Sequence, residues 1–436
     1  MGIEGRQIPN GRWVRIIPVA LLMYTIAFVN RTNISLALPD IGRNLQMNPK
    51  QAGEVAGIFF WGYLLLQIPG GYLADHWSAK RFIAILLGAW GLCAAGCGLV
   101  RNWQQLWAMR LFLGVAEGGV YPATLVLLSH WFPRSERARA NALWNLCLPL
   151  AVVVSSPLSG WILDRWNWRV MLVSSGFLPF VWLPLWALFI EDRPADALWL
   201  SVRERTYLEE SLQRETAPAE PQDVRSYLRA LLCPQVLVLM ATYFLLIFGQ
   251  LGMLFWLPSA LEKSARGSNF FVALLFAVPF MLAAISMVLN SLHSDRTRER
   301  RAHVAVSLGV AGLLLFAGVH LSVRFQLLAY ILICFAAAGA YAPLGPFWTI
   351  PSELLPKKIA GSAMGLINGV GNLGGYFGPL VVGYLDKMTG GFRAGFDVLA
   401  AGMLVASALP FLVASSNVQL ARERGNPAGA SSDRTG

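Results

Sequence analysis

Long apolar stretches recur along the whole chain, separated by short polar segments. A membrane-spanning helix needs roughly 20 mostly apolar residues, and the bilayer interior leaves no backbone hydrogen-bonding group unpaired. Repeated stretches of that length predict a helical membrane protein with about twelve spans. The first six lie near Val14–Leu38, Ala52–Ala74, Phe82–Val100, Gln104–Leu128, Ala140–Ile162 and Val170–Ile190. The second six lie near Val236–Leu261, Phe270–Leu292, Val304–Ser322, Leu327–Ile350, Ile359–Leu385 and Phe396–Ser415.

One long polar segment divides the pattern near its middle, between Glu191 and Cys233. We therefore expect an all-α integral membrane fold in which twelve transmembrane helices form two pseudo-symmetric six-helix bundles. The predicted N-terminal bundle comprises residues 1–190, the linker residues 191–233, and the C-terminal bundle with its tail residues 234–436. Hydrophobic residues make up 56% of the chain and charged residues 14%, which excludes an ordinary soluble domain.

Arginine and lysine are concentrated in the loops and tails of one side, for example at 76–81, 134–139 and 296–301. By the positive-inside rule this side is cytoplasmic, so both termini and the linker are expected in the cytoplasm. The net charge of +11 is explained by this topology and does not indicate nucleic-acid binding. No cleavable signal peptide is expected, because the basic start runs directly into a segment long enough to span.

The cysteines and histidines do not form a metal-binding pattern. Cys93 and Cys97 lie four residues apart on an apolar helix, and no histidine accompanies them at zinc-ligand spacing. We expect neither a metal nor a cofactor. The chain also lacks a recognisable catalytic dyad and an appended soluble domain, which disfavours a membrane-bound enzyme or sensor.

Three charged residues fall deep inside predicted spans: Arg31, Arg110 and Glu117. A charge at the bilayer centre costs about 2.5–3.5 kcal/mol on the lenient insertion scale, so such residues usually face a cavity, a partner or a substrate. Arg110, Gly114 and Glu117 share one helix face, and the glycine permits close approach of another helix. Two arginines and one glutamate suggest binding of an anion and of a proton.

A loop pattern occurs once in each half. Asp75 ends the second span just before Lys80 and Arg81, and Asp295 with Arg296 ends the eighth before a second basic loop. A carboxylate there can accept hydrogen bonds from the N-terminus of a neighbouring helix, forming a gating latch that opens and closes. The alternative interpretation is a solvated loop that serves topology alone.

These loops resemble the motif that follows the second helix in the major facilitator superfamily, although His76 and Ser78 replace its usual arginine and glycine. Asn30-Arg31-Thr-Asn33 and the segment from Arg110 to Glu117 are similar to stretches of its anion:cation symporter family. That family includes sialin-type transporters and bacterial permeases for sugar acids and aromatic carboxylates. The resemblance implies cotransport of an organic anion with a cation, commonly a proton.

The resemblance also implies roles for individual residues. A planar guanidinium holds a carboxylate through two hydrogen bonds, so Arg31 is expected to anchor the substrate. The other expected substrate-binding residues are Tyr63, Gln67, Arg110, Trp348 and Asn368. Glu117 is the expected proton-coupling residue, and Asp75, Asp295 and Arg296 the gating residues.

Two features of the same stretches favour other interpretations. Arg110 and Glu117 could form a buried pair that only ties helices together. Asn30 stands where the family usually carries aspartate, so Arg31 is expected to lack an acidic neighbour in its own segment. The segment Tyr341–Pro351, rich in proline and glycine, is expected to break the tenth helix beside the site.

Together these observations predict a monomeric secondary transporter of the bacterial inner membrane. It would import a small carboxylate, either a sugar acid or an aromatic acid, by proton symport through alternating access, with the lipid bilayer as its surroundings. An organic-anion uniporter or exchanger is the alternative, and a membrane-bound enzyme or sensor a remote one.

Overall fold

A computed structural model describes residues 10–215, 233–264, 267–321, 323–355 and 357–413, and every regular element in these ranges is a helix. The predicted all-α fold is therefore confirmed. Both chain ends and residues 216–232 of the predicted linker lie outside the described residues.

Residues 10–189 contain ten α-helices and one π-helical turn, η1 (Ala74–Ser78). The α-helices are α1 (Gly11–Thr32), α2 (Ile34–Asn44), α3 (Pro49–Gly57), α4 (Phe59–Leu73), α5 (Ala79–Cys97), α6 (Trp103–Gly118), α7 (Val120–Trp131), α8 (Arg134–Asn145), α9 (Cys147–Arg165) and α10 (Trp168–Phe189).

The linker contributes α11 (Val202–Glu215), and the second half follows. Its helices are α13 (Pro234–Ser264), α14 (Asn269–Thr297), α15 (Arg301–His320), α16 (Gln326–Tyr341), α17 (Leu344–Leu354), α18 (Lys357–Gly371), α19 (Gly374–Thr389) and α20 (Arg393–Ala408).

Ten stretches of helix in the described ranges are long and apolar enough to cross a membrane. They coincide with ten of the twelve predicted spans. The remaining two, predicted near 52–74 and 359–385, are also helical and consist of α3 with α4 and of α18 with α19.

Several spans are interrupted near their middle. The first is divided at Asn33, two residues after Arg31, and the fourth at Gly119, two residues after Glu117. The predicted break in the tenth span is confirmed, since α16 ends at Tyr341 and α17 begins at Leu344. Proline has no N–H to continue the helix ladder, and the freed carbonyl of Ala342 accepts a hydrogen bond of 2.9 Å from Asn290 Nδ2. Discontinuous helices of this kind line binding sites in transporters.

Polar side chains fix where several helices begin. Asn48 and Gln51 form a reciprocal capping box at the start of α3, with hydrogen bonds of 2.9 and 3.0 Å. Side-chain oxygens of Asn102, Asn167 and Ser268 accept hydrogen bonds from backbone N–H groups at the starts of α6, α10 and α14. These caps allow short loops between consecutive spans.

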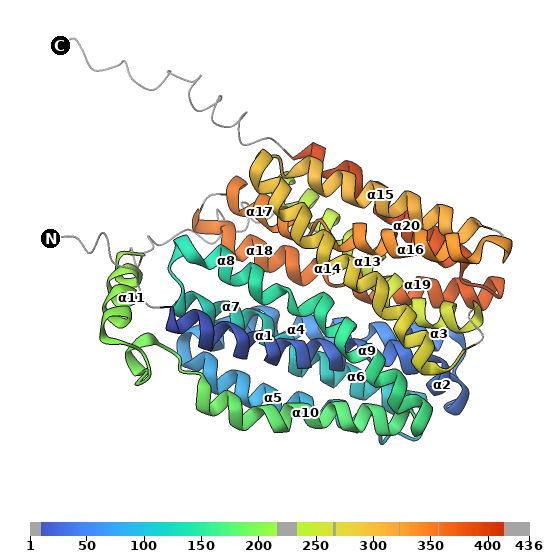
Figure 1. The fold of residues 1–436 in the computed structure, drawn as a ribbon, viewed down its shortest axis with the longest axis horizontal. Helices are drawn as coiled ribbons and strands as arrows, with labels where there is room; N and C mark the ends of the chain where they lie inside the picture. The colour runs from blue at the N-terminus through green and yellow to red at the C-terminus, as the bar shows by residue number, and fades with distance from the viewer. Residues whose placement is uncertain (1–9, 216–232, 265–266, 322, 356, 414–436) are drawn as a thin grey trace, which may run out of the picture.

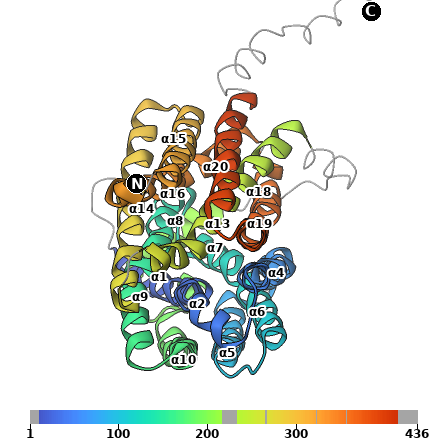
Figure 2. The same ribbon diagram turned by 90° about the vertical axis from the view of Figure 1, so that its right-hand side faces the viewer.

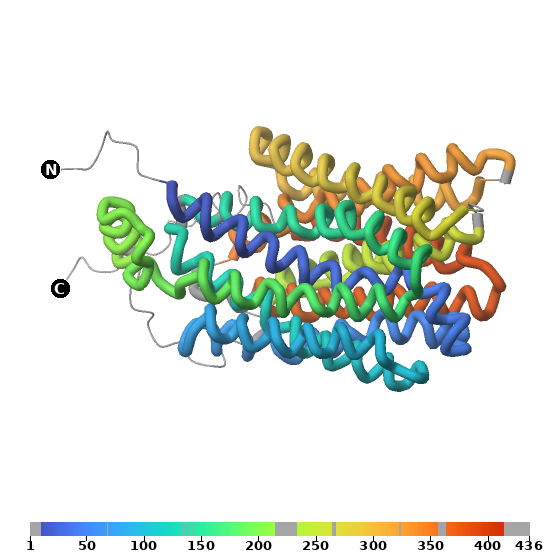
Figure 3. The backbone as a smooth tube through the Cα atoms, turned by 60° about the horizontal axis from the view of Figure 1, so that its bottom comes forward, coloured from blue at the N-terminus to red at the C-terminus, as the bar shows by residue number. Residues whose placement is uncertain are grey.

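The helices run roughly along the long axis of the molecule (Figure 1). Seen along that axis, the helices of the first half lie below those of the second half, in two bundles (Figure 2). We call the end where α1 begins and α10 finishes the linker end, because α11 lies there (Figure 3). The opposite end, with the loops after α2 and α9, is the far end.

The bundles are packed tightly against each other at the far end, through glycines of α3 and α19. A Cβ atom on Gly53 would lie 2.5 Å from the carbonyl oxygen of Pro379, and one on Gly57 would lie 2.7 Å from that of Tyr376. Small residues let helix backbones approach closely in membranes. The far end of the described structure is therefore closed.

The described part of the linker packs on the first bundle. Asp192 accepts hydrogen bonds from Ser78 Oγ (2.5 Å) and from the backbone N–H of Lys80 (2.8 Å), which caps α5. The indole rings of Trp199 and Trp131 stack at 5.3 Å. Residues 191–215 thus form a cover over the linker end of this bundle.

Candidate functional site

Arg31 and Glu117 meet in the interior of the first bundle. Arg31 lies at the end of α1 and Glu117 at the end of α6, and their side chains are 6% and 0% exposed. Both Nε and Nη2 of Arg31 donate to Oε2 of Glu117, at 3.3 and 3.2 Å. Oε1 of Glu117 is buried without a hydrogen-bond partner in the described structure. Arg31 therefore has an acidic partner after all, contributed by another helix.

Aromatic rings surround the Arg31 guanidinium. Its central carbon lies 4.7 Å from the ring centre of Tyr63, 5.0 Å from Phe59 and 5.5 Å from Phe28. Its Nη2 also donates to the hydroxyl of Tyr24 at 3.4 Å. Aromatic faces attract a cation, more strongly where water is excluded. The rings thus hold the charge of Arg31 in place without neutralising it.

Glycines on α6 bring Glu117 close to α4. A Cβ atom on Gly114 would collide with the backbone of Phe59, and one on Gly118 with the backbone of Tyr63. The expectation that Gly114 permits close helix approach is therefore confirmed. The same packing places Tyr63 beside the Arg31–Glu117 pair.

Arg110 is directed at the backbone of the first two spans. Its three nitrogens donate to the carbonyl oxygens of Arg31 (3.2 Å), Ala56 (3.1 Å) and Val55 (3.4 Å). The residue is 1% exposed. In this arrangement Arg110 ties α6 to α1 and α3, while Arg31 is the arginine that pairs with Glu117.

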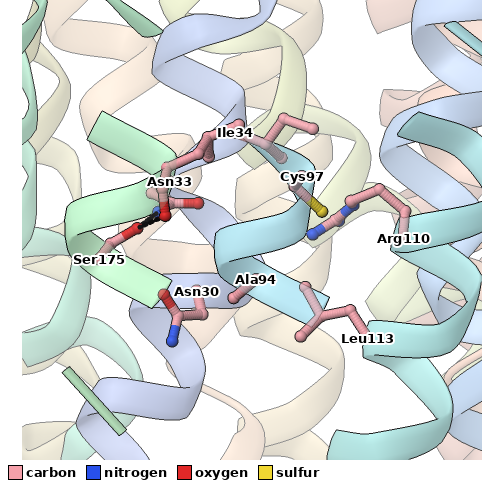
Figure 4. Close-up of a pocket in the computed structure, with 9 residues that line it drawn as sticks. Asn30, Asn33, Ile34, Ala94, Cys97, Arg110, Leu113 and Ser175 are labelled. Carbon is pink, nitrogen blue, oxygen red and sulfur yellow. Dashed lines mark hydrogen bonds between the residues drawn. The ribbon is translucent and has the colours of Figure 1, made fainter. Parts of the chain in front are cut away.

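A small cavity of about 10 Å³ lies between α1, α2, α5, α6 and α10 (Figure 4). Asn30, Asn33 and Arg110 are among its lining residues, and Asn33 Nδ2 donates to Ser175 Oγ at 2.7 Å. Both amide atoms of Asn30 are buried and have no hydrogen-bond partner among the described residues. The cavity is close to the smallest that holds one water molecule. Asn30 thus lines this cavity, whereas the next residue, Arg31, contacts Glu117.

An amide chain joins the two bundles next to Glu117. Gln67 Nε2 donates to the carbonyl oxygen of Gly118 (3.1 Å), and Asn368 Nδ2 donates to Gln67 Oε1 (3.0 Å). Asn372 Nδ2 in turn donates to Asn368 Oδ1 at 3.0 Å. The structure thus brings Gln67 and Asn368, predicted from separate segments, into direct contact.

Trp348 lies in an aromatic cluster of the second bundle. Its ring is 4.9 Å from that of Tyr243 and 5.3 Å from that of Phe347. The ring of Tyr243 also lies against Gly371 of α18, where a Cβ atom would collide with it. Tyr243 links Trp348 to the helix that carries Asn368, and no feature of the sequence distinguished it from the other aromatic residues of the spans.

The predicted gating residues lie at the linker end. Oδ1 of Asp75 is 3.7 Å from His130 Nε2, and Oδ1 of Asp295 is 2.6 Å from Arg300 Nη1. The aspartate side chains are 58% and 66% exposed, and Arg296 is exposed as well. In this structure the partners of both carboxylates come from their own bundles.

A further buried charge cluster at the linker end was not predicted. Arg12 is 2% exposed and bridges Glu204 of α11 and Glu136 of α8, each at 2.7 Å. Glu204 also accepts hydrogen bonds from the backbone N–H groups of Gly11 and Arg12. Its charge thus lies at the N-terminus of α1, where a carboxylate is favourable. The partners are far apart in sequence, so residue spacing does not reveal the cluster.

Interrupted membrane-spanning helices around a buried, charged and aromatic site define a multi-pass membrane transporter. The family model of the Major Facilitator Superfamily matches residues 20–379, and the chain belongs to this superfamily. The superfamily predicted from the sequence is therefore confirmed, with its fold of two six-helix bundles.

Relatives of known name are also transporters. A putative tartrate transporter of Agrobacterium vitis is 33% identical over 413 residues, which are 92% of this chain and 93% of that protein. A quinolone resistance transporter of Acinetobacter baumannii is 29% identical, over 92% of this chain and 93% of the relative. The protein is thus a transporter and not an enzyme.

Among solved structures, a bacterial homologue of the human lysosomal transporter Spinster has the same fold. Its inward-facing, occupied conformation matches with a TM-score of 0.74 at 17% identity. The match covers 97% of this chain and 100% of the other.

Proposed function

We propose that this protein is a secondary active transporter that imports a small organic acid by proton symport through alternating access. The substrate class is a carboxylate, either a sugar acid or an aromatic acid. The observation that carries the proposal is the buried Arg31–Glu117 pair, which offers one group for an anion and one for a proton. The tartrate transporter among the relatives supports the choice of an organic acid.

The pair couples the two ligands through competition for Arg31. While Glu117 is ionised, its Oε2 occupies Nε and Nη2 of Arg31. A proton on Glu117 removes the charge that holds this contact, and Arg31 can then donate to a substrate carboxylate with its planar fork. Anion binding is thereby linked to protonation, which is the requirement for symport.

Neutral residues of both bundles would complete the site. Gln67 and Asn368 meet across the bundles at 3.0 Å and carry amide groups for substrate hydroxyl or carboxylate oxygens. Tyr63 and Trp348 supply aromatic surface on either side. Arg110 holds the carbonyl of Arg31, which positions the anchor, and its direct contact with substrate stays a prediction.

We further propose that the protein resides as a monomer in the bacterial inner membrane, with its linker end in the cytoplasm. The excess of basic residues in the linker-end loops supports this orientation. Residues 1–190 and 234–436 would act as the two moving bodies. The glycine crossing of α3 and α19 then closes the periplasmic side.

Binding and uptake together test the function. Thermal-shift measurements on the purified protein with a panel of sugar acids and aromatic carboxylates should identify a ligand, because binding to the folded state raises its stability. In proteoliposomes, an imposed inward proton gradient should then drive accumulation of that ligand. An exchanger would require anion on the other side and would ignore the pH gradient.

We expect the two loop aspartates to control turnover. Asp75→Asn and Asp295→Asn should each slow transport while leaving ligand affinity unchanged, since both residues are exposed at the linker end, away from the site. Uptake rates and thermal shifts measure the two effects separately. Asp196→Asn, at an exposed position of the same end, is the control. An unchanged rate in the variant that carries both replacements would assign these loops to topology alone.

A further inference from the structure

A carboxylate of the first bundle binds the start of a helix of the second bundle at the far end. Asp164 lies near the end of α9, and its Oδ1 accepts a hydrogen bond of 2.8 Å from the backbone N–H of Asn269. Its Oδ2 accepts one of 2.9 Å from the backbone N–H of Phe270. The first N–H groups of a helix have no partner inside the helix, and the N-terminus favours negative charge. Asp164, which belongs to the opposite bundle, supplies both the hydrogen-bond acceptors and the negative charge.

Close packing one helical turn away fixes this contact. A Cβ atom on Gly160 would lie 2.5 Å from Cβ of Ala273 and 2.8 Å from the carbonyl oxygen of Asn269. Gly160 precedes Asp164 by four residues, so both lie on the face of α9 that meets α14. Separation of the bundles at this end therefore has to break the Asp164 hydrogen bonds and this packing together.

A carboxylate that accepts hydrogen bonds from the N-terminus of a neighbouring helix was expected for Asp75 and Asp295. The structure shows this contact for Asp164 instead, at the far end of the molecule. Those two aspartates have partners within their own bundles. Asp164 instead joins the bundles, and α14 carries the Asp164 contact at its first residues and Asp295 near its last turn. One helix thus contains a cross-bundle contact at the closed end and an aspartate paired within its own bundle at the other.

We infer that Asp164 is a gating residue that holds the far end closed and releases α14 when that end opens. This role rests on the proposed alternating access. It predicts that loss of the carboxylate shifts the protein toward the state that is open at the far end. Replacement of a helix cap changes such an equilibrium by roughly fivefold.

A second polar contact between the bundles at this end offers a matched control. Arg43 Nη1 pairs with Glu262 Oε1 at 3.0 Å, with side chains that are 65% and 31% exposed, and Asp164 is an exposed residue as well. Arg43 also keeps a partner in Asp40 at 2.6 Å. Arg43 keeps Asp40 as a partner when Glu262 is replaced, whereas Asp164 accepts from two backbone N–H groups at the start of α14. Glu262→Gln therefore removes one negative charge, as Asp164→Asn does, with a smaller expected effect.

Hydrogen–deuterium exchange on the full chain in lipid nanodiscs, without substrate, tests the inference. In Asp164→Ala we expect exchange to rise about fivefold in residues 268–272 and also in α3 and α19, which do not contact the mutated residue. Asp164→Asn keeps one accepting oxygen and should show the same pattern with a smaller rise. Exchange in α17, at the linker end, should fall. Ser268→Ala removes the cap that α14 makes within its own bundle, and should raise exchange in the first turn of α14 alone.

The outcomes separate the gate from simpler explanations. A rise confined to residues 268–272 in the Asp164 variants would reduce the residue to a local cap and overturn the inference. An equal rise of exchange in α3 and α19 in Glu262→Gln would overturn the inference too. Loss of any negative charge at the far end would then open that end, and Asp164 would have no special role. A far-end rise without a linker-end fall would support the gate and contradict alternating access, so the two proposals fail in different ways.

Discussion

Replacement of Arg31 by alanine should weaken substrate binding roughly 10- to 100-fold, since hydrogen bonds to a charged group contribute about 1.5–3 kcal/mol. Arg31→Lys keeps the charge but loses the planar fork and the contact geometry with the aromatic rings, so its loss should be smaller. Ligand-induced thermal shifts and initial uptake rates measure both effects.

The alanine variant has a side effect that needs a control. Glu117 is 0% exposed and would lose the partner of its Oε2, and a broken buried pair is destabilising by about 3–5 kcal/mol. The double variant Arg31→Ala with Glu117→Gln removes that buried charge and should regain stability without regaining binding. Wild-type affinity in either variant would show that another group anchors the anion.

Glu117→Gln should separate exchange from accumulation. Glutamine resembles the protonated side chain and cannot release a proton, so the loaded carrier can still alternate but the proton-releasing step is blocked. We expect anion exchange between the two sides of a proteoliposome to continue, while uphill uptake driven by a pH gradient is lost.

Asp386 provides the matched control for that variant. It is a buried carboxylate of the second bundle, 6% exposed, and lies 3.5 Å from Lys263. Asp386→Asn should therefore retain uphill uptake. Concentrative uptake by Glu117→Gln at the wild-type level would place the coupling proton on another residue.

The order of spans and their breaks follow largely from local sequence. The length of each apolar stretch is enough to predict a helix, because every span must cross the bilayer with about 20 mostly apolar residues, whatever the other spans do. Pro343 and Pro346 predict the break in the tenth span, and Gly114 the close helix contact, since each acts through its own backbone geometry. Neither the break at Asn33 nor the break at Gly119 was predicted, although Pro122 lies three residues after Gly119 and cannot donate to the carbonyl of Gly118.

Pairing between distant residues could not be predicted in the same way. Arg31 and Glu117 are 86 positions apart, and the sequence offered Arg110 as an equally good partner for the glutamate. The choice depends on rotation of α1 against α6, which the packing of whole helices decides. The Arg12–Glu204 contact spans 192 positions, and the use of Asp164 as a cap depends on where α14 starts in space.

The net charge of the site determines how transport responds to the membrane potential. Arg31, Arg110 and ionised Glu117 sum to one positive charge, and addition of one proton and one monocarboxylate leaves that sum unchanged. Loaded and empty carriers would then respond equally to voltage, and the cycle would be electroneutral. A dicarboxylate with one proton lowers the sum by one, and each such charge couples to about 2.3 kcal/mol per 100 mV. An imposed potassium-diffusion potential should therefore leave monocarboxylate uptake unchanged and oppose dicarboxylate uptake when the interior is negative, which makes voltage a measure of substrate charge.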